Sequence, residues 1–571
     1  MLLFINYDIF IIINHLKNAI VPAYDENRKV TKKPCREVAF PDRVKQFLIA
    51  LTNKKPNQMY KNVLNQYTLG KILLIVSCFA SYTASAQLTL TGQLKTRGEL
   101  RDGYGTLKPI GSSNAALVSQ RTRLTFNYKS SKLIFQTSVQ DVRLWGQDAS
   151  TITINDGSRL SLHEAWAELI LSNKKETAFK VSPVDYFAVK IGRQELVYDD
   201  ERLMGGSDWL QQARRHDAVV LKLIQKGWQV DLGGAFNQSS DAINYNGTYY
   251  TPANVPATVK DSNGNMANTP AGFIPLLNAA GLSSKTGTPA FLNPPGTNAL
   301  NQNYKALEYV YFSRKFNKTK VSGLFLADQF GKYKLDSVKN ISGTEEGYVY
   351  GKRFNQAGVN GRYTTGLLIN PVFGAKDKWG INAGFYYQGG HDKDGLALNA
   401  YTYTIALLYK GSNVSYTAGL DYLSGNDAFS ASKTNHRFDP LYGTPHKFWG
   451  YMDYFYAGSG SPTGGLSNPY LKLKYVSNNK RFSTELAGHG FLLANDQKGT
   501  DGQAIHKYLG TEFDLTTVYK LNKFTNVDLG LSYMAATRSM EYAKALTPGS
   551  SKLHPVWAYL QLNIKPEFLN K

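Results

Sequence analysis

The stretch LTLTGQLKTRGELR, residues 88–101, alternates strictly between two kinds of side chain. Its even-numbered positions hold Leu, Gly and Thr, whereas its odd-numbered positions hold Thr, Gln, Lys, Arg and Glu. Successive side chains of a β-strand point to opposite faces of the sheet. The stretch therefore predicts a strand with one apolar face and one charged face.

The same alternation recurs along the rest of the chain. In the next segment Leu124, Phe126 and Tyr128 alternate with polar and basic residues. Repeated alternation of this kind predicts an all-β protein. Eighteen such segments begin near residues 88, 120, 132, 162, 186, 217, 228, 306, 320, 355, 379, 398, 414, 470, 482, 508, 527 and 556. An even number of strands is what single-chain bacterial barrels contain.

The connections between these segments alternate in length. Short turns follow the second, sixth, eighth, twelfth, fourteenth and sixteenth segments, and most of the other connections are long. Exceptions are the short connection 389–397 and the long turns 172–185 and 366–378. Short periplasmic turns and long extracellular loops characterise outer-membrane barrels. We therefore predict a transmembrane antiparallel β-barrel of about eighteen strands.

A soluble β-sandwich or a β-propeller is the alternative fold, because both also alternate apolar and polar residues. A sandwich has no reason to alternate the length of its connections strictly. A propeller would show a repeat of about 40 to 50 residues, and no such repeat is present in the sequence. A helical membrane protein is not expected, because no stretch reaches the roughly 18 consecutive apolar residues that a spanning helix needs.

The first 86 residues are expected to be absent from the mature barrel. Residues 59–86 have the features of a signal peptide: Lys61 and Lys71, then an apolar run, then Ala84-Ser85-Ala86 before Gln87. Residues 1–58 are expected to be an upstream extension, and residues 87–571 the barrel. Lipidation at Cys78 is an alternative interpretation, although the apolar run before it is short.

The charge of the chain favours acidic partners. The net charge is +22, of which the first 86 residues contribute +7, so that +15 remains for residues 87–571. Nucleic acid is not expected as a partner of an exported protein. Both cysteines precede residue 87, which excludes disulfides and cysteine-based zinc sites from the barrel.

The basic residues of the first strands are the candidate binding site. An Arg or Lys on the lipid face near the midplane costs about 2 to 4 kcal/mol, so these side chains should point into the lumen. There they would form a ladder of donors for carboxylates, sulfates or phosphates. The predicted members are Lys95, Arg97, Arg101, Arg121, Arg123 and Arg143. Alternatively, they only pair with lumenal acids and hold the wall together, the candidate acids being Glu99, Glu164, Glu168 and Asp141.

Catalytic arrangements are poor. His163 and Glu164 are adjacent, as are His216 and Asp217, and adjacent strand residues point to opposite faces. The acidic run 199–201 lacks the spacing of an EF-hand. We predict that the protein is not an enzyme and has no cofactor and no metal site.

Two regions resemble the alginate export family. They are GRQELVYDDERLMG (192–205) with DWLQQARR (208–215), and GND (425–427) with RFDPLY (437–442) and HKFWGY (446–451). The Asn- and Tyr-rich body is similar to family sequences of the Bacteroidetes type. The resemblance implies an eighteen-stranded outer-membrane barrel whose basic lumen conducts an acidic polysaccharide. Four arginines match motif positions and are implied members of the anion path: Arg193, Arg202, Arg214 and Arg215.

The resulting hypothesis is a passive, anion-preferring channel in the outer membrane of a Gram-negative bacterium. It would contact membrane lipid and lipopolysaccharide, and it would pass acidic saccharides or small anionic solutes. We expect a monomer whose lumen is narrowed by the loops 237–305 and 425–469. The alternative is a surface polysaccharide-binding barrel with a plugged lumen.

Overall fold

The computed structural model is described here for most of the chain after residue 86. The predictions of an upstream extension and of a signal peptide concern residues 1–86, which lie outside the described residues. The described ranges are 87–146, 160–175, 184–238, 251–252, 255–290, 304–342, 345–354, 356–456 and 462–570.

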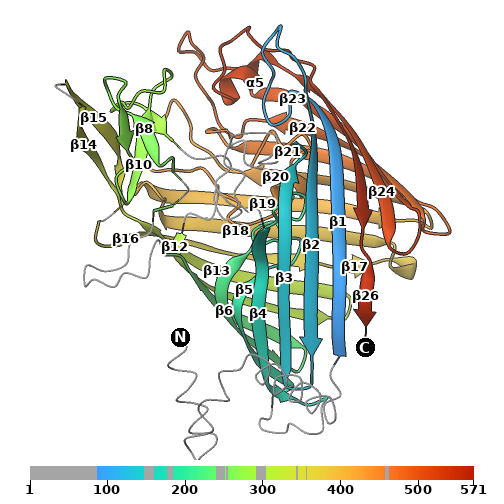
Figure 1. The fold of residues 1–571 in the computed structure, drawn as a ribbon. Coiled ribbons are helices and arrows are strands. Elements are labelled where there is room, and N and C mark those ends of the chain that lie inside the picture. Colours follow the sequence, from blue (N-terminus) through green and yellow to red (C-terminus); the bar gives the residue numbers. More distant parts are fainter. Residues whose placement is uncertain are drawn as a thin grey trace, which may run out of the picture. The chain divides into compact units, whose positions relative to one another are not determined.

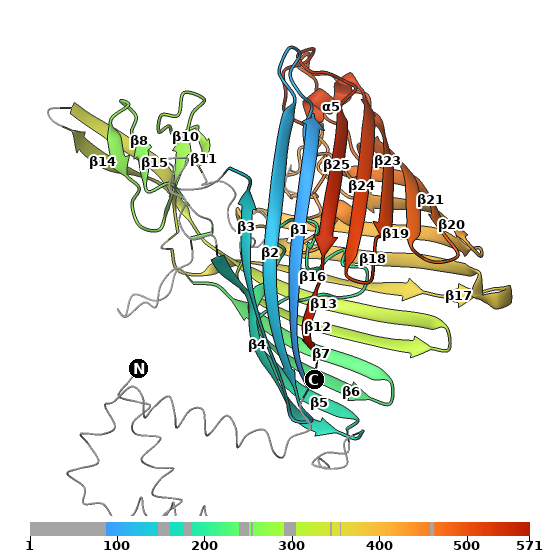
Figure 2. The same cartoon turned by 45° about the vertical axis from the view of Figure 1, so that its right-hand side comes forward.

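Within these ranges, eighteen long strands form one antiparallel sheet that closes into a barrel. The first strand, β1 (Gln87–Asp102), pairs with the second and also with the last long strand, β25 (Val556–Ile564), which closes the sheet (Figure 2). The other barrel strands are β2 (Ala115–Lys129), β3 (Leu133–Leu144), β4 (Leu160–Asn173), β5 (Tyr186–Gln194), β6 (His216–Gln225), β7 (Trp228–Phe236), β12 (Tyr304–Phe316), β13 (Thr319–Gly331), β16 (Val359–Asn370), β18 (Trp379–His391), β19 (Ala397–Lys410), β20 (Val414–Leu423), β21 (Leu466–Val476), β22 (Phe482–Leu492), β23 (Tyr508–Lys520) and β24 (Thr525–Ala536).

The predicted fold class is therefore confirmed. Each predicted strand begins within five residues of an observed barrel strand. Helical structure is slight, and no helix in the described part of the chain is long and apolar enough to cross a membrane. The shorter elements are β17 (Val372–Phe373), β26 (Glu567–Asn570), the 3-10 helices η2 (Ala375–Asp377) and η3 (Pro445–Lys447), and the helix α5 (Arg538–Ala543), which Figure 1 labels.

The two faces of the barrel wall differ in polarity. On β2, Leu124 and Phe126 point outward and are exposed, whereas Arg121 points inward and is fully buried. Large apolar side chains are exposed along the outer face of strand after strand, and most of the buried polar side chains face inward. Exposed apolar surface on this scale suits contact with lipid rather than with water. The wall is thus built to span a membrane around a polar interior.

The connections fall at two ends of the barrel. At one end, which we call the turn end, most strands are joined by short turns; β6 and β7 are joined by Lys226 and Gly227, whose φ angles of 48° and 80° suit a tight hairpin turn. At the other end, the loop end, most of the connections are long. This asymmetry matches the predicted arrangement of short turns and long loops.

The loop 237–305 was predicted to narrow the lumen, but its described part forms a separate sheet instead. The described part of this connection contains β10 (Phe273–Leu277) and β11 (Thr288–Pro289), which form a separate sheet with β14 (Lys334–Ser342) and β15 (Glu345–Arg353) from the next long connection. The strands β8 (Thr258–Lys260) and β9 (Met266–Asn268) form a small ribbon beside it. The four-stranded sheet has an apolar core of its own around Phe273 and Val349, and the burial of these side chains stabilises it locally.

Two other long connections fold into the barrel and pack against each other. Loop A comprises residues 195–215 between β5 and β6, and loop B comprises residues 424–456 between β20 and β21. Their side chains Met204, Tyr442 and Trp449 are at most 1% exposed and share a core with the inner wall. The buried part of loop B, which belongs to the predicted constriction 425–469, therefore lies inside the barrel, whereas residues 466–469 belong to the wall strand β21. We call loops A and B together the plug.

Candidate functional site in the barrel lumen

Five of the predicted basic residues share the lumen face of two neighbouring strands. Lys95, Arg97 and Arg101 lie on β1, and Arg121 and Arg123 lie on β2. The Cα atoms of Lys95 and Arg121 are direct partners in the strand pairing. Because residues two positions apart on a strand point to the same face, these cations form a row along the inner wall. We call this row the basic ladder.

Loop A packs directly over the middle of the basic ladder. One carboxylate oxygen of Asp208 accepts a hydrogen bond from NH2 of Arg121 at 2.8 Å, and the other lies 3.4 Å from Nζ of Lys95. The backbone carbonyl of Asp208 also accepts from Lys95 at 2.6 Å, and that of Gln211 accepts from NH1 of Arg121 at 3.1 Å. The centre of the ladder therefore binds a segment of its own chain.

The loop-end part of the ladder is paired with an acid of the wall. Glu99 lies 2.9 Å from Nε of Arg97 and 2.8 Å from NH2 of Arg101. The guanidinium of Arg97 also stacks on the ring of Trp209 in loop A, 3.9 Å from its centroid. This part of the site matches the alternative interpretation, in which basic residues and lumenal acids hold the wall together.

Two cations nearer the turn end have uncharged partners. Nε and NH2 of Arg123 donate to the side-chain oxygen of Gln140 at 3.1 and 2.8 Å. Nζ of Lys190, which lies on the lumen face of β5, is 3.8 Å from the ring centroid of Trp166. Across the described ranges, no carboxylate forms an ion pair with either cation.

Arg143 and Arg193 were predicted to face the lumen, and the structure shows that this prediction is wrong. Arg193 forms two bonds of 2.8 Å with Asp217, which belongs to the exposed, outward row of β6. Arg143 forms bonds of 2.6 and 2.8 Å with Asp141 on the outward face of β3. Both pairs lie near the loop end of their strands. There an outward charge approaches the polar interface of a membrane, where its cost is small.

The remaining predicted arginines belong to loop A. Arg202 is 3.1 Å from Asp421 of the wall and lies over the ring of Phe448 in loop B. Arg214 is buried and donates to the carbonyl of Gly443 in loop B. Arg215 is half-buried at the end of loop A. Arg202 and Arg214 thus tie the two loops of the plug to each other and to the wall.

Loop B is attached to the opposite side of the lumen. The hydroxyl of Tyr442 donates to Asp328 on β13 at 2.6 Å, and Asp328 is also held by Arg362 on β16. A second bond from Arg362, of 2.7 Å, reaches Asp439 of loop B. The backbone N–H of Met452 donates to a carboxylate oxygen of Glu512 on β23 at 2.8 Å. The plug therefore contacts wall strands on several sides of the barrel.

The charges of the plug depend on their surroundings. Burial acts to raise the pKa of Asp208, but the charges of Lys95 and Arg121 outweigh it and lower the pKa below its usual value. Burial raises the pKa of Glu195, and it lowers the pKa of Arg214 to about 10. Asp208 is therefore held as a carboxylate by its cationic partners.

One of the rejected acid–base pairs has a geometry that differs from the prediction. A register shift in the pairing of β3 with β4 lies beside His163, which is fully buried and 2.9 Å from Glu195. Glu164 accepts hydrogen bonds from Gln136 and Trp166 on the lumen face. The bulge thus places both residues on the inner side, and the prediction of opposite faces is wrong for this pair.

The other pair and the acidic run behave differently. His216 is buried and Asp217 is exposed on the outer face, as predicted for neighbours in a strand. Asp199 accepts from Tyr311 and lies 2.8 Å from Lys320. Asp199 thus attaches loop A to the wall, whereas Glu201 binds Thr444 and Lys447 of loop B.

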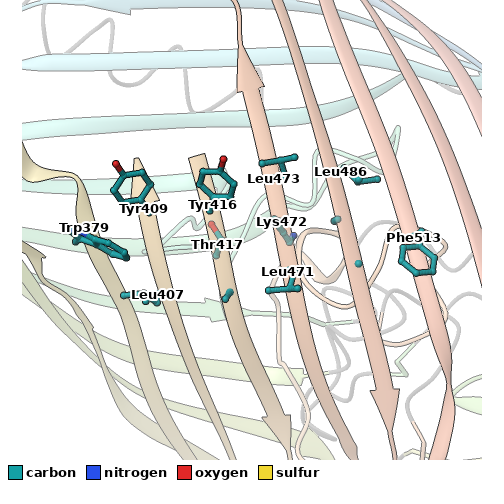
Figure 3. Close-up of a pocket in the computed structure, with 13 residues that line it drawn as sticks. Trp379, Leu407, Tyr409, Tyr416, Thr417, Leu471, Lys472, Leu473, Leu486 and Phe513 are labelled. Carbon is teal, nitrogen blue, oxygen red and sulfur yellow. The ribbon is translucent and has the colours of Figure 1, made fainter. Parts of the chain in front are cut away.

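A cavity of about 800 Å³ lies on the wall formed by β18 to β23 (Figure 3). Leu471, Leu486 and Phe513 in its lining are 66%, 49% and 50% exposed and point outward. It is therefore a hollow in the lipid-facing surface and not a part of the lumen site.

Reasoning from the sequence missed two central residues. Lys190 alternates with the outward Phe187, Val189 and Ile191 on β5, so the period of that strand could have placed it in the lumen. Asp208 lies in the motif DWLQQARR, but no local pattern shows that a loop folds inward against a strand 113 positions earlier. That contact is set by the closed barrel.

A closed barrel with an apolar outer wall and a charged lumen defines an outer-membrane β-barrel of the porin-like class. Residues 86–235 match the model of the alginate export family, described as "Alginate export". This match covers the first of the two motif regions, 192–215, and confirms the resemblance there. Both the fold and the family match are those of channel-like barrels rather than enzymes, and they indicate a Gram-negative outer membrane.

Similar solved structures include three outer-membrane proteins. Acinetobacter baumannii OccAB4 is 11% identical, with a TM-score of 0.48, covering 85% of this chain and 99% of that one. Pseudomonas aeruginosa OpdK with vanillate is 11% identical, with a TM-score of 0.45 and the same coverage. Pseudomonas aeruginosa OccK3 (OpdO) is 9% identical, with a TM-score of 0.47, covering 84% and 96%. No curated protein matches the chain.

Proposed function

We propose that the barrel is an anion-preferring channel that passes acidic saccharides or small anionic solutes past the plug. The observation that carries this proposal is the pair of lumen cations Arg123 and Lys190. Each contacts an uncharged group, the amide of Gln140 or the ring of Trp166. Each therefore retains a positive field for a passing anion.

The acids on the same part of the wall have partners other than Arg123 and Lys190, so they do not fully cancel this positive field. Glu168 accepts from Tyr186 and is paired with Lys222 at 2.6 Å. Glu164 and Glu195 also lie near these cations, but they are hydrogen-bonded to Gln136, Trp166 and His163 rather than paired with Arg123 or Lys190. In a lumen with low-dielectric walls, a cation that is not paired with a carboxylate raises the local concentration of anions.

Selectivity measurements in planar bilayers test the proposal. In a salt gradient, the reversal potential of the wild-type channel should show preference for anions, and the double variant Arg123→Gln with Lys190→Gln should lose much of that preference. Arg193→Gln is the matched control, since its guanidinium lies on the outer face beside Asp217. Equal anion preference in the wild type and the double variant would refute the proposal.

A surface polysaccharide-binding barrel is the second candidate, and the plug favours it. Loops A and B contact β1 and β2 on one side of the lumen and β13 and β23 on others. A plug with so many attachments could keep the lumen closed. Reconstituted barrels that bind polygalacturonate but carry no current under any tested voltage would support this candidate over the channel.

A further inference from the structure

Asp208 forms ion pairs with two buried cations, although its own carboxylate is accessible. The side chains of Lys95 and Arg121 are 5% and 0% exposed, whereas that of Asp208 is 61% exposed. Its two oxygens bind different cations, one each. The carboxylate thus sits at the surface of a site whose floor is positive, with its other side toward the lumen.

We infer that Lys95 and Arg121 form a binding site for a solute carboxylate, and that Asp208 occupies this site as an internal ligand while loop A is in place. The inference rests on the proposed function and adds the mechanism by which the solute displaces loop A of the plug. A solute carboxylate of similar geometry takes the place of Asp208, and loop A moves away from the wall.

The burial of the two cations makes the exchange depend on the charge of the solute. A buried cation left without a counter-charge is strongly unfavourable. Loop A therefore leaves the wall readily only when another anion reaches Lys95 and Arg121. A neutral sugar supplies no such replacement, so it does not release the loop.

Arg123 provides the approach to this site. It lies two positions from Arg121 on the same face of β2, which places it about 7 Å nearer the turn end. Among the described residues, its guanidinium donates hydrogen bonds to Gln140. A carboxylate held first at Arg123 is one step from the cations that Asp208 occupies.

The backbone of loop A sets the size of the effect. The carbonyl groups of Asp208, Trp209 and Gln211 also accept hydrogen bonds from the ladder, so a single side-chain change does not detach the loop. Removing one charge-assisted contact shifts such an equilibrium by about tenfold. The same factor is expected for the open fraction of the channel.

Bilayer recordings with D-glucuronate as the probe and glucose as its neutral counterpart test the inference. Glucuronate should raise the open fraction of the wild-type channel by about tenfold, and glucose should not. Asp208→Asn should be open about tenfold more without glucuronate and should no longer respond to it. Asp217→Asn removes a carboxylate from the outer wall and serves as the matched control. An unchanged open fraction and an unchanged glucuronate response in Asp208→Asn would overturn the inference.

Hydrogen exchange gives a second readout on the wild-type chain, should Asp208→Asn fail to assemble. Glucuronate should accelerate exchange of the amide of Gly205 in loop A, which donates to the carbonyl of Tyr442 in loop B and is protected while the two loops are in contact. No change on adding glucuronate would overturn the inference. The reversal potential separates this outcome from the proposed function, because anion-selective currents that ignore glucuronate refute the internal ligand alone, whereas cation-selective currents refute the channel proposal.

Discussion

The bond between Tyr442 and Asp328 offers a direct measure of how firmly loop B is held. The Tyr442 hydroxyl is buried and donates to the Asp328 carboxylate at 2.6 Å. Tyr442→Phe removes this hydrogen bond and leaves the ring packed against Tyr304. A hydrogen bond to a charged group contributes about 1.5 to 3 kcal/mol. At 1.4 kcal/mol for each factor of ten, the opening equilibrium of loop B should rise roughly 10- to 150-fold.

Hydrogen exchange measured by mass spectrometry reads this equilibrium directly. The amides of Tyr442 and Thr444 donate to loop A carbonyls at 2.9 and 2.8 Å, so they exchange only when the loops separate. Tyr333→Phe is the matched control, because it removes a hydroxyl bond of 2.8 Å to Asp394 outside the plug. If exchange at Tyr442 and Thr444 changes less than about threefold, the bond to Asp328 does not hold loop B, and the reasoning is refuted.

Three further predictions concern pH and packing. Because the pKa of Asp208 is lowered from 3.8, its contribution to closure is complete above that pH and is lost as the pH falls through the lowered value; single-channel open fraction should therefore rise in acid, and Asp208→Asn should abolish the rise. Burial lowers the pKa of Lys544 to about 7 from 10.5, so the packing of this residue, which donates to the carbonyl of Tyr454, should strengthen as the pH rises from 7 to 10.5. Lys544→Met should remove this trend in exchange rates corrected for pH, and a trend that survives would contradict the assignment. A Cβ at Gly530 would clash with the ring of Tyr559 across the strand pair, so Gly530→Ala should cost about 1 to 3 kcal/mol, seen as a lower urea midpoint of barrel unfolding; an unchanged midpoint would show that the ring moves freely.

The barrel could be predicted from the sequence because its main determinants are local. The alternation of Leu94 with Lys95, or of Phe126 with Arg123 and Thr125, is visible without any knowledge of the neighbours. The alternation within each strand shows which of its faces contacts lipid. The number of strands then follows from counting such segments.

The site was predicted less completely, because it depends on contacts between distant segments. The placement of Arg193 failed, since it was carried over from a motif rather than from the period of β5, on which Lys190 and Gln194 point inward. The inward packing of loop A over Lys95 could not be predicted, because Asp208 meets it only after the barrel closes. The bulge at His163 is a similar case, visible only in the strand pairing.

The junction of β1 with β25 and β26 has a consequence for how the protein is assembled. The side chains of Gln87 and Asn570 are hydrogen-bonded although they are 483 positions apart. Closing a chain segment of that length costs about 4 kcal/mol more conformational entropy than closing a four-residue turn. This junction should therefore form last, after all the hairpins. We expect a partly folded chain to stay open at this junction, which the assembly machinery must then hold. During assembly of the wild-type chain, cross-links across the junction should form last.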